Sequence, residues 1–395
     1  MKKYDVVIVG AGMVGLSLAT LLNKDNFSVC VIESQKINLS YDQPTARVSA
    51  IHLTSQKLLD YLGVWELLKT DATPLQKMHI WDHAQHAQLH FNSDDIQQTE
   101  MGWIVDNSAI ISALRKKLSD IDFYQPVSPE KCLIEKNKII LFLNNTEKIE
   151  TDLIVGADGA NSWVREQMQM NMHTRSYYQQ SIIAVIKTEL PHDNIAYQKF
   201  LTTGPVALLP LKNKNHTALV WSADENISDE LMKNSDDIFA EKLTRTLDFK
   251  LGKLKIISER ASFSLIMRHA SDYVSSHFAL VGDAAHTIHP LAGLGVNLGL
   301  MDAACLAQIL REARENKKSL GDFRVLRRYT RWRKSENTPI ICAMRQLKEL
   351  FAIDSNAFNY LRDFTINTID QQLTIKKQLM QIATGKSKEL PSFLQ

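Results

Sequence analysis

Cysteine is scarce in this chain of 395 residues, and its spacing excludes the common cysteine-based sites. The four cysteines are Cys30, Cys132, Cys305 and Cys342, and no two of them form a CxxC pair. Such usage is typical of a reducing compartment, and it predicts neither a disulfide framework nor a structural zinc or other metal site.

Long apolar runs are also missing. No stretch of about 18 residues is both free of charge and strongly apolar, so the sequence predicts no membrane-spanning helix, and any membrane contact would be peripheral. Lys2 and Lys3 precede an apolar start, as in a secretory signal, but Asp5 interrupts it. We therefore expect a buried strand that is kept in a cytoplasmic protein, with peripheral contact to the inner face of a membrane as an alternative.

An excess of charge of one sign is absent as well. Lys and Arg total 46 against 44 Asp and Glu, which gives a net charge of +2 and makes nucleic acid an unexpected partner. Apolar residues make up 45% and charged residues 23%, so the chain is an ordinary globular protein. Its length predicts two or three compact units at roughly 100–200 residues each.

The first thirty residues carry a nucleotide-binding pattern. An apolar strand, Tyr4–Val9, leads into Gly10, Gly12 and Gly15, a helical pattern follows, and a second strand ends at Glu33. Glycines at this spacing allow a tight turn, close approach of a pyrophosphate and close packing of helix on strand. An acid at position 33 can accept hydrogen bonds from ribose hydroxyls and repels a 2′-phosphate, which favours NAD or FAD over NADP.

Two further strands end in a glycine and an acid, and this pattern favours FAD over NAD as the cofactor. Asp283 lies in LVGDAAH and is followed by the glycine loop PLAGLGVN. An acid there can bond the hydroxyls of a ribityl chain, and a dehydrogenase that uses NAD has no need for this second site. Asp158 ends a third strand in IVGADGANS, where it either supports the cofactor or is only a turn residue that bonds its own backbone.

Two stretches interrupt this pattern, and the end of the chain is basic. Residues 75–100 alternate faintly, and residues 176–265 contain a predicted hairpin whose strands, Val206–Leu211 and Ala218–Trp221, offer an apolar wall. Residues 311–349 hold twelve Lys or Arg against five Asp or Glu. We expect Pro339 to open a helix with an apolar stripe, which either packs on the nucleotide domain or contacts a membrane or partner.

These motifs resemble the flavoprotein aromatic hydroxylases with the fold of para-hydroxybenzoate hydroxylase. Arg47–Ile51, Gly282–Pro290 and Tyr329–Asn337 are similar to the ubiquinone-biosynthesis hydroxylases, which act on polyprenylated phenols. The resemblance implies an α/β fold, with a Rossmann-like FAD-binding domain of discontinuous segments, an antiparallel β-sheet substrate domain and a helical C-terminus. The implied boundaries are 1–74, 101–175 and 266–336 for the FAD-binding domain, 75–100 and 176–265 for the substrate domain, and 337–395 for the helical region.

The resemblance also implies roles for single residues. Gly10, Gly12, Gly15 and Glu33 hold the ADP half of FAD, and Asp158 supports a turn near the cofactor. Asp283 bonds the ribityl and pyrophosphate region, and Gly293, Leu294, Gly295 and Asn297 lie beside the flavin ring. Leu294 replaces the glutamine usual in the family. Arg47, near the diphosphate and the mouth of the site, and Pro290 are the candidate catalytic residues, in positioning roles only. Pro290 and the strand Ala207–Pro210 are the candidate walls.

The implied function is an FAD-dependent monooxygenase. It hydroxylates the ring of a polyprenylated phenol in ubiquinone biosynthesis through a C4a-hydroperoxyflavin, with O₂ and an electron donor that is NAD(P)H or a reductase. Three alternatives stay open: a small-phenol hydroxylase, an isoprenoid reductase, and a non-catalytic flavin-binding subunit. The partners considered are a second copy of the chain, a quinone-biosynthesis complex and a membrane surface.

Histidines suggest a second kind of site. His79, His83, His86 and His90 are spaced by four, three and four, which places them on one side of a helix, but no thiol or carboxylate set accompanies them. A solvated strand or loop is therefore preferred over a metal site. For His286 and His289 a structural role in shaping the loop is preferred over catalysis.

Overall fold

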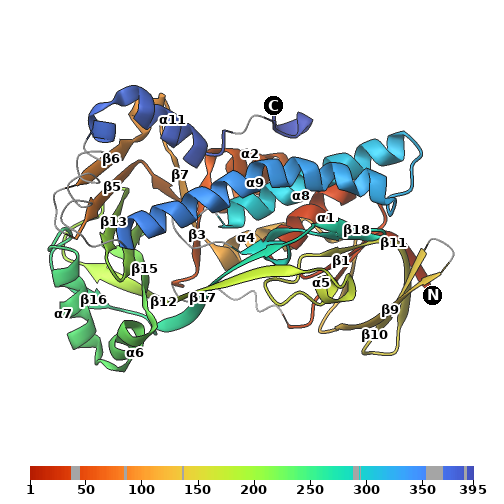
Figure 1. Ribbon diagram of the computed structural model, residues 1–395, viewed down its shortest axis with the longest axis horizontal. Coiled ribbons are helices and arrows are strands. Elements are labelled where there is room, and N and C mark those ends of the chain that lie inside the picture. The colour runs from red at the N-terminus through yellow and green to blue at the C-terminus, as the bar shows by residue number, and fades with distance from the viewer. Residues whose placement is uncertain are drawn as a thin grey trace.

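The glycine turn follows the central strand of an eight-stranded sheet in the protein, which is seen here in a computed structural model (Figure 1). The structure describes residues 1–36, 45–83, 87–135, 138–287, 293, 295–352, 368–386 and 389–395. The strands of this first sheet, in spatial order, are β18 (Val274–Ser275), β19 (Phe278–Leu280), β11 (Lys148–Gly156), β1 (Lys2–Val9), β2 (Val29–Ile32) and β8 (Asp122–Tyr124), with β10 (Lys138–Leu143) and β9 (Pro129–Glu135) attached to β11.

The centre of the first sheet is parallel and buried on both faces. β1 pairs in parallel with β2 and β11, and Val6, Val7 and Ile8 have no exposed surface. Helices α1 (Met13–Lys24), α4 (Asn107–Lys116) and α8 (Gly295–Glu315) accompany this sheet, and α1 contacts both of the other two. A parallel sheet needs cover on both faces, which explains the continuous apolar run in β1.

A nine-stranded sheet forms the second layer. Its strands, in spatial order, are β20 (His286–Thr287), β17 (Ala261–Ala270), β12 (Met172–Thr188), β15 (His216–Asp224), β14 (Gly204–Pro210), β13 (Ile195–Leu201), β5 (Lys77–Asp82) and β6 (Gln88–Asn92), with β16 (Leu254–Ile256) beside β12. All pairs are antiparallel except β13 with β5. The predicted hairpin is confirmed, because β14 pairs with β15.

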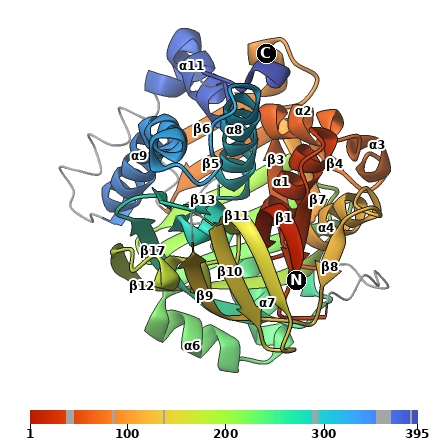
Figure 2. The same ribbon diagram turned by 90° about the vertical axis from the view of Figure 1, so that its right-hand side faces the viewer.

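Two helices cover one face of this second sheet. α6 (Glu225–Lys233) and α7 (Asp236–Thr246) pack on the face that carries Leu208 and Trp221. Figure 2 shows α6 on the side of the molecule opposite to α8 and α9. The other face of the sheet is turned toward the first sheet and lines a cavity.

The other described elements lie outside these two sheets. They are the three-stranded sheet β3 (Val48–His52), β7 (Gly102–Asp106) and β4 (Thr73–Leu75), the helices α2 (Leu53–Tyr61), α3 (Trp65–Leu68), α5 (Trp163–Gln167), α9 (Phe323–Ala352) and α11 (Leu373–Ala383), and the short turns η1 (Ser93–Ile96), η2 (Gly282–Ala284) and η4 (Ser392–Leu394). The α/β class, the antiparallel sheet and the helical C-terminus are thus as predicted. The assignment of segments to domains stays a prediction.

The prediction that Pro339 opens a helix is wrong, because Pro339 lies inside α9. A proline there removes one hydrogen bond, the one to the carbonyl of Ser335. Both residues are exposed, so water can satisfy that carbonyl. The opposite side of α9 is buried, with Tyr329 and Arg333 in the interior. This packing stabilises the helix on both sides of the proline.

A buried carboxylate joins α8 to α9. Asp302 of α8 accepts hydrogen bonds from Arg333 Nε at 2.7 Å, from His286 Nε2 at 2.6 Å and from the amide of Gly282 at 3.0 Å. Asn337 adds a further contact, from its Nδ2 to Asp302 Oδ1 at 3.2 Å. The motif Tyr329–Asn337 therefore supplies interior contacts, and His286 has the structural role preferred above.

The charge of this carboxylate is held by its partners. Burial alone would raise the pKa of Asp302, but the nearby His286 and Arg333 outweigh burial and lower the pKa to about 2. Asp302 is 0% exposed and Arg333 is 4% exposed, so neither charge has water as a substitute partner. Breaking such a pair leaves a buried charge without compensation.

We predict that Asp302→Asn destabilises the protein by about 3–5 kcal/mol, because Arg333 keeps its charge in the interior. The matched control is Glu312→Gln, since Glu312 and Arg328 join the same two helices at 2.5 Å on the surface. That exposed pair should cost less than about 1 kcal/mol. Chemical denaturation of the FAD-saturated proteins measures both, and equal losses would contradict a buried ion pair as the main tie between α8 and α9.

Candidate active site

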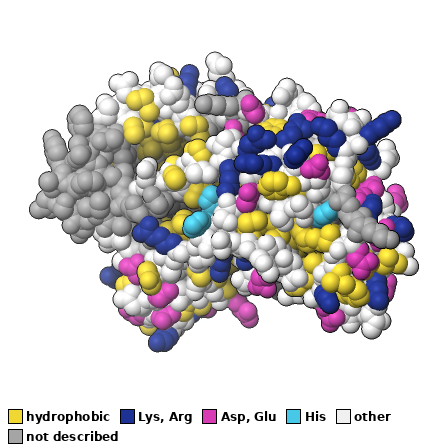
Figure 3. All heavy atoms as spheres, turned by 45° about the vertical axis from the view of Figure 1, so that its right-hand side comes forward, with side chains coloured by type: hydrophobic (Ala, Val, Ile, Leu, Met, Phe, Trp, Pro, Cys, Tyr) yellow, Lys and Arg dark blue, Asp and Glu magenta, His cyan; other side chains and the backbone are white. Residues whose placement is uncertain are grey.

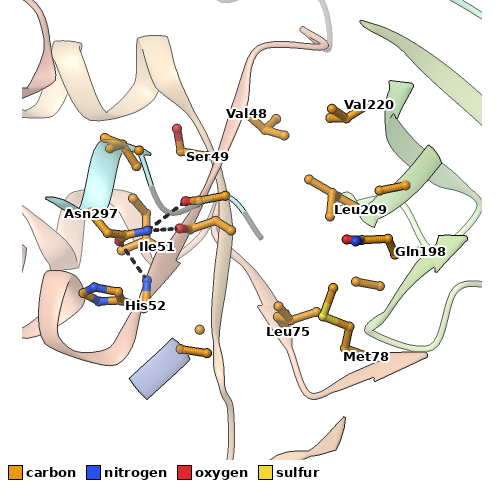
Figure 4. A pocket seen from close by; sticks show the side chains of 18 of the residues that line it. Val48, Ser49, Ile51, His52, Leu75, Met78, Gln198, Leu209, Val220 and Asn297 are labelled. Atoms are coloured by element: carbon orange, nitrogen blue, oxygen red, sulfur yellow. Dashed lines mark hydrogen bonds between the residues drawn. The ribbon is translucent and has the colours of Figure 1, made fainter. Parts of the chain in front are cut away.

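A cavity of about 1000 Å³ lies between the two large sheets. Figure 4 shows its two sides, with Val48, Ser49, Ile51, His52 and Asn297 facing Leu75, Met78, Gln198, Leu209 and Val220. The first group comes from β3 and α8, and all of the second except Leu75 come from the second sheet. Gly12 and Val14 also line the cavity, which therefore lies between the glycine turn of the first sheet and the face of the second sheet that is turned away from α6 and α7.

The glycine turn contributes open space to this cavity at one position only. A Cβ on Gly10 would lie 2.3 Å from the carbonyl oxygen of Ala157, and one on Gly15 would lie 2.1 Å from that of Gly10. A Cβ on Gly12 would meet nothing within 4 Å, and Gly12 lines the cavity. Gly10 and Gly15 thus serve packing inside the protein, whereas Gly12 leaves room for a ligand.

The start of α1 is suited to an anion. Gly12 is the N-cap residue and offers no side chain to the first turn of the helix. Free amide groups and the helix dipole favour negative charge at such an end. Glu33 lies beside it, because its Oε2 accepts the amide of Ala11 at 2.9 Å and its Oε1 accepts that of Gln35 at 2.9 Å.

The two other acids lie at different depths. Asp283 lines the cavity and is exposed within it. The surrounding protein removes bulk water and raises the pKa of Asp283, while the nearby His286 and Arg268 oppose that rise. Asp158 is behind the wall, where its Oδ2 accepts the amide of Val164 at 3.2 Å at the start of α5. Burial raises the pKa of Asp158, and hydrogen bonds from Ser162 and Val164 oppose the rise.

Asn297 joins α8 to β3 at the floor of the cavity. Its Nδ2 donates to the carbonyl of Ala50 at 2.7 Å and to that of Gly293 at 3.0 Å, and its Oδ1 accepts the amide of His52 at 3.1 Å (Figure 4). Gly293 has a φ of +61°, which favours glycine. Gly293, Gly295 and Asn297 all line the cavity. Leu294 and Pro290 lie outside the described residues.

Arg47 lies apart from this set. Its side chain is exposed and is not among the residues that line the cavity. Its backbone carbonyl accepts the amide of Asn107 at 3.1 Å, so the residue helps to place the start of α4. A role of the Arg47 guanidinium at the cofactor or the mouth of the site stays a prediction.

The predicted wall is half right. Ala207 and Leu209 line the cavity, whereas Leu208 and Pro210 do not. Trp221 also faces away from the cavity, where its ring packs edge-on against Phe239 with centroids 5.6 Å apart. Successive side chains of a strand point to opposite faces, so only alternate residues of β14 can reach the cavity.

Residues 3–336 match the family described as the FAD binding domain. The chain belongs to this family of FAD-dependent monooxygenases. It is 31% identical to the ubiquinone hydroxylase UbiL of Rhodospirillum rubrum, over 98% of this chain and 91% of that protein. It is 29% identical to the mitochondrial ubiquinone biosynthesis monooxygenase COQ6 of Danio rerio, over 96% of this chain and 90% of that protein.

Solved structures share the fold. The p-nitrophenol 4-monooxygenase PnpA of Pseudomonas putida superposes with a TM-score of 0.78 at 16% identity, covering 99% of this chain and 100% of that one. The anhydrotetracycline hydroxylase OxyS of Streptomyces rimosus gives a TM-score of 0.74 at 21% identity, covering 98% and 77%. At these identities the likeness concerns the fold alone.

FAD is the cofactor of this monooxygenase family, and the cavity fits it. The open position at Gly12, the free helix end and Glu33 suit an adenosine diphosphate, and Asp283 offers a carboxylate to hydroxyl groups further along. The backbone around Gly293 and Gly295 lines the same space. Gly12, Asp283, Gly293 and Gly295 therefore line one continuous cavity, and Glu33 lies beside its Gly12 end, as a long dinucleotide requires.

The cavity also includes residues that the sequence motifs did not indicate. α11 contributes Leu379, Met380 and Ala383, more than 80 residues after the last motif of the glycine loop. Thr54 Oγ1 donates to the carbonyl of Gly385 at 2.8 Å, which ties the end of α11 to α2. No local signal in the sequence could place α11 here, because its position depends on contacts with distant segments.

His52 is a second residue that the motifs missed. Its Nδ1 accepts the amide of Ser55 at 3.0 Å, so it caps α2 and the proton of the neutral ring lies on Nε2. Burial lowers the pKa of His52 to about 4, and the ring adds no positive charge to the cavity at neutral pH.

Two of the histidines considered for a metal site, His79 and His90, lie on the strands of a hairpin and not on a helix. His79 of β5 is directly opposite His90 of β6, and their rings stack with centroids 4.4 Å apart. Within the described residues, no group of three or more His, Cys, Asp or Glu could hold a metal ion. His86 and His289 lie outside the described residues.

Proposed function

We propose that this chain hydroxylates the aromatic ring of a polyprenylated phenol in ubiquinone biosynthesis. The observation that carries the proposal is the composition of the cavity wall. Among the described residues that line it there is no Lys or Arg, and Asp82 and Asp283 are its only acids. A substrate that carries a carboxylate would find no cation there, whereas a neutral phenol needs none. The names of the two relatives above support the same assignment.

The far part of the cavity suits an apolar tail. The side chains there are Leu75, Met78, Ile80, Leu89, Phe91, Met101, Trp103, Leu379 and Met380. Each buried methylene contributes about 0.8 kcal/mol, so one prenyl unit of five carbons should tighten binding by several kcal/mol before ordering costs. A hydroxylase for small soluble phenols does not need this corridor.

We assign the cofactor as follows. Gly12 and the start of α1 receive the diphosphate, with Gly10 and Gly15 shaping the turn, and Glu33 receives the adenosine ribose. Asp283 receives the ribityl chain, Asp158 supports its turn from behind, and Gly293, Gly295 and Asn297 lie beside the ring. Leu294 is assigned there through its backbone.

When bound, FAD supplies the electron transfer and oxygen activation that ring hydroxylation needs. The chain holds the ring of the substrate and excludes water, through the apolar side chains of β13, β14 and β15 that face the cavity. The overall reaction consumes O₂ and two electrons, and releases water beside the hydroxylated ring. The electron donor, which is NAD(P)H or a separate reductase, stays a prediction, as do a homo-oligomer and a quinone-biosynthesis complex.

Peripheral contact with a membrane is part of the proposal. α11 exposes Leu373, Ile375, Leu379 and Ile382, and α9 exposes Arg324, Arg327 and Arg331. Figure 3 shows a band of basic side chains and a hydrophobic patch on one face of the molecule. Leu379 also lines the cavity, so this surface adjoins the proposed corridor for the tail. No helix in the described parts of the chain is long and apolar enough to cross a membrane.

The substrate assignment predicts a large difference between two phenols. With the FAD-loaded protein, reductant and ¹⁸O₂, kcat/KM should be roughly 100-fold or more higher for 2-geranylphenol than for para-hydroxybenzoate, because only the first fills the corridor. Mass spectrometry should find one labelled oxygen in the product. Equal values for the two phenols would exclude the prenylated substrate, and turnover without label would favour a reductase.

The cofactor assignment predicts that two glycines respond differently to valine. Gly12→Val should fold with an unchanged melting temperature in the FAD-free protein, yet bind no FAD, because its side chain enters only the cavity. Gly15→Val should fail to fold, because its side chain meets the carbonyl of Gly10. Flavin absorbance and thermal unfolding test both variants. A Gly12→Val protein that retains full FAD would refute the assignment.

The membrane assignment predicts binding to anionic vesicles. The protein should sediment with vesicles that contain phosphatidylglycerol and less with pure phosphatidylcholine, because each basic residue near such a surface contributes about 1 kcal/mol. Changing Arg324, Arg327 and Arg331 to Gln should remove this preference. Changing Lys212 and Lys214 to Gln, which are exposed at the far end of the second sheet, is the control. If the protein with the three Arg changes and the protein with the two Lys changes sediment equally with anionic vesicles, this surface does not bind the membrane.

A further inference from the structure

Gln198 occupies the centre of the sheet face that lines the cavity. It lies on β13, directly opposite Ile80 of β5 on one side and Ala207 of β14 on the other. Ala196 and Phe200 precede and follow it on the same face, and all five residues line the cavity. The amide is therefore surrounded by apolar side chains.

The side chain of Gln198 is buried and points into the cavity. It is only 7% exposed, and Figure 4 shows its amide directed toward the space in front of Leu209 and Met78. The next residue, Lys199, faces the other side of the sheet, where its Nζ pairs with Asp248 at 2.7 Å. Because side chains alternate along the strand, the ion-paired Lys199 lies on one face of the sheet and the amide of Gln198 lies on the other, in the cavity.

Within the described part of the chain, no residue hydrogen-bonds the side chain of Gln198. The contrast is Gln179 on β12, whose Nε2 donates to the carbonyl of Thr203 at 2.9 Å and to Asp224 at 3.1 Å. A carboxamide has two donor hydrogens and an acceptor oxygen, and the apolar side chains around it offer no partner for them. A group that enters the cavity can supply the missing partner.

We propose that Gln198 is a substrate-binding residue that hydrogen-bonds the hydroxyl group of the aromatic ring and so fixes how the ring lies in the cavity. This inference rests on the proposed function. A phenol hydroxyl can both donate and accept a hydrogen bond. A carboxamide can also do both, because its NH₂ group donates and its oxygen accepts. The amide is neutral, so it selects a neutral ring and offers no compensation for a carboxylate.

The consequence is a specificity based on the hydroxyl group. A site built around a buried polar group disfavours a ligand that leaves this group unpaired. The apolar neighbours of Gln198 hold the ring and the tail, whereas the amide alone distinguishes a phenol from its ether. Removing the amide should therefore change which ligand is preferred and which ring carbon is hydroxylated.

The test compares 2-geranylphenol with its methyl ether, 2-geranylanisole, on the FAD-loaded protein. Binding is followed by quenching of tryptophan fluorescence, because Trp103 lines the cavity. The wild type should bind the phenol roughly tenfold more tightly than the ether. Gln198→Leu should bind the phenol about tenfold more weakly than the wild type does and should lose less affinity for the ether, whose oxygen can accept a hydrogen bond but cannot donate one. Its hydroxylated product should be a mixture of isomers.

Gln180→Leu is the matched control. Gln180 lies on the same sheet, but its amide is already bonded to Ser228 and Asp229. This variant should keep the preference of the wild type for the phenol.

The outcomes separate this inference from the proposed function. If Gln198→Leu binds both ligands as tightly as the wild type does, the amide binds only water and the inference is overturned. If it loses both equally, the residue shapes the wall and does not recognise the hydroxyl, which also overturns it. In both cases turnover of 2-geranylphenol with label from ¹⁸O₂ by the wild type leaves the proposed function intact. A wild type that binds neither ligand refutes the substrate class and the inference together.

Discussion

The buried carboxylate of Asp302 is the contact on which the geometry of the cofactor side depends. One oxygen holds the amide of Gly282 and the ring of His286, and the other holds Arg333. The turn that carries Asp283 is thereby fixed to α8, and α8 in turn holds β3 through Asn297. A carboxylate can connect these elements only if its charge is compensated, which explains why an arginine and a histidine accompany it in the interior.

The substrate side depends on a different constraint, the alternation of side chains along a strand. α6 and α7 cover one face of the second sheet and bury Trp221 and Leu208 there. The other face is left with smaller residues such as Ala196 and Ala207, and so a cavity remains in front of it. The size of the cavity thus depends on which residues of each strand have small side chains. Gln198 differs from its neighbours on this face because its side chain is polar.

The sequence predicted best those parts of the site that consist of consecutive residues. Gly10, Gly12, Gly15 and Glu33 form a local unit, so their spacing alone indicates a strand, a turn and a helix end. The wall was predicted less well, because Ala207–Pro210 and Trp221 were assigned by composition, whereas the facing of a strand depends on its register. Pro339 was misjudged because packing on α8 overrides the local preference of proline.

The contributions of α11 and Gln198 could not be predicted from local pattern at all. α11 reaches the cavity through contacts of Thr384 and Gly385 with α2, which join residues more than 300 positions apart. Gln198 is one glutamine among many, and only the absence of a hydrogen-bond partner among the described residues distinguishes it. Both features depend on the three-dimensional arrangement of distant segments.

The short strand β20 has a consequence for how a long ligand can leave. Because His286 and Thr287 pair with His269 and Arg268 of β17, the segment that follows Asp283 is also an edge of the second sheet. A hinge motion that separated the two large sheets would break this ladder and pull at the residues that hold Asp302. We therefore expect the walls of the cavity to move as one body. The residence time of a bound tail should then depend on side-chain rotations and on displacement of α11.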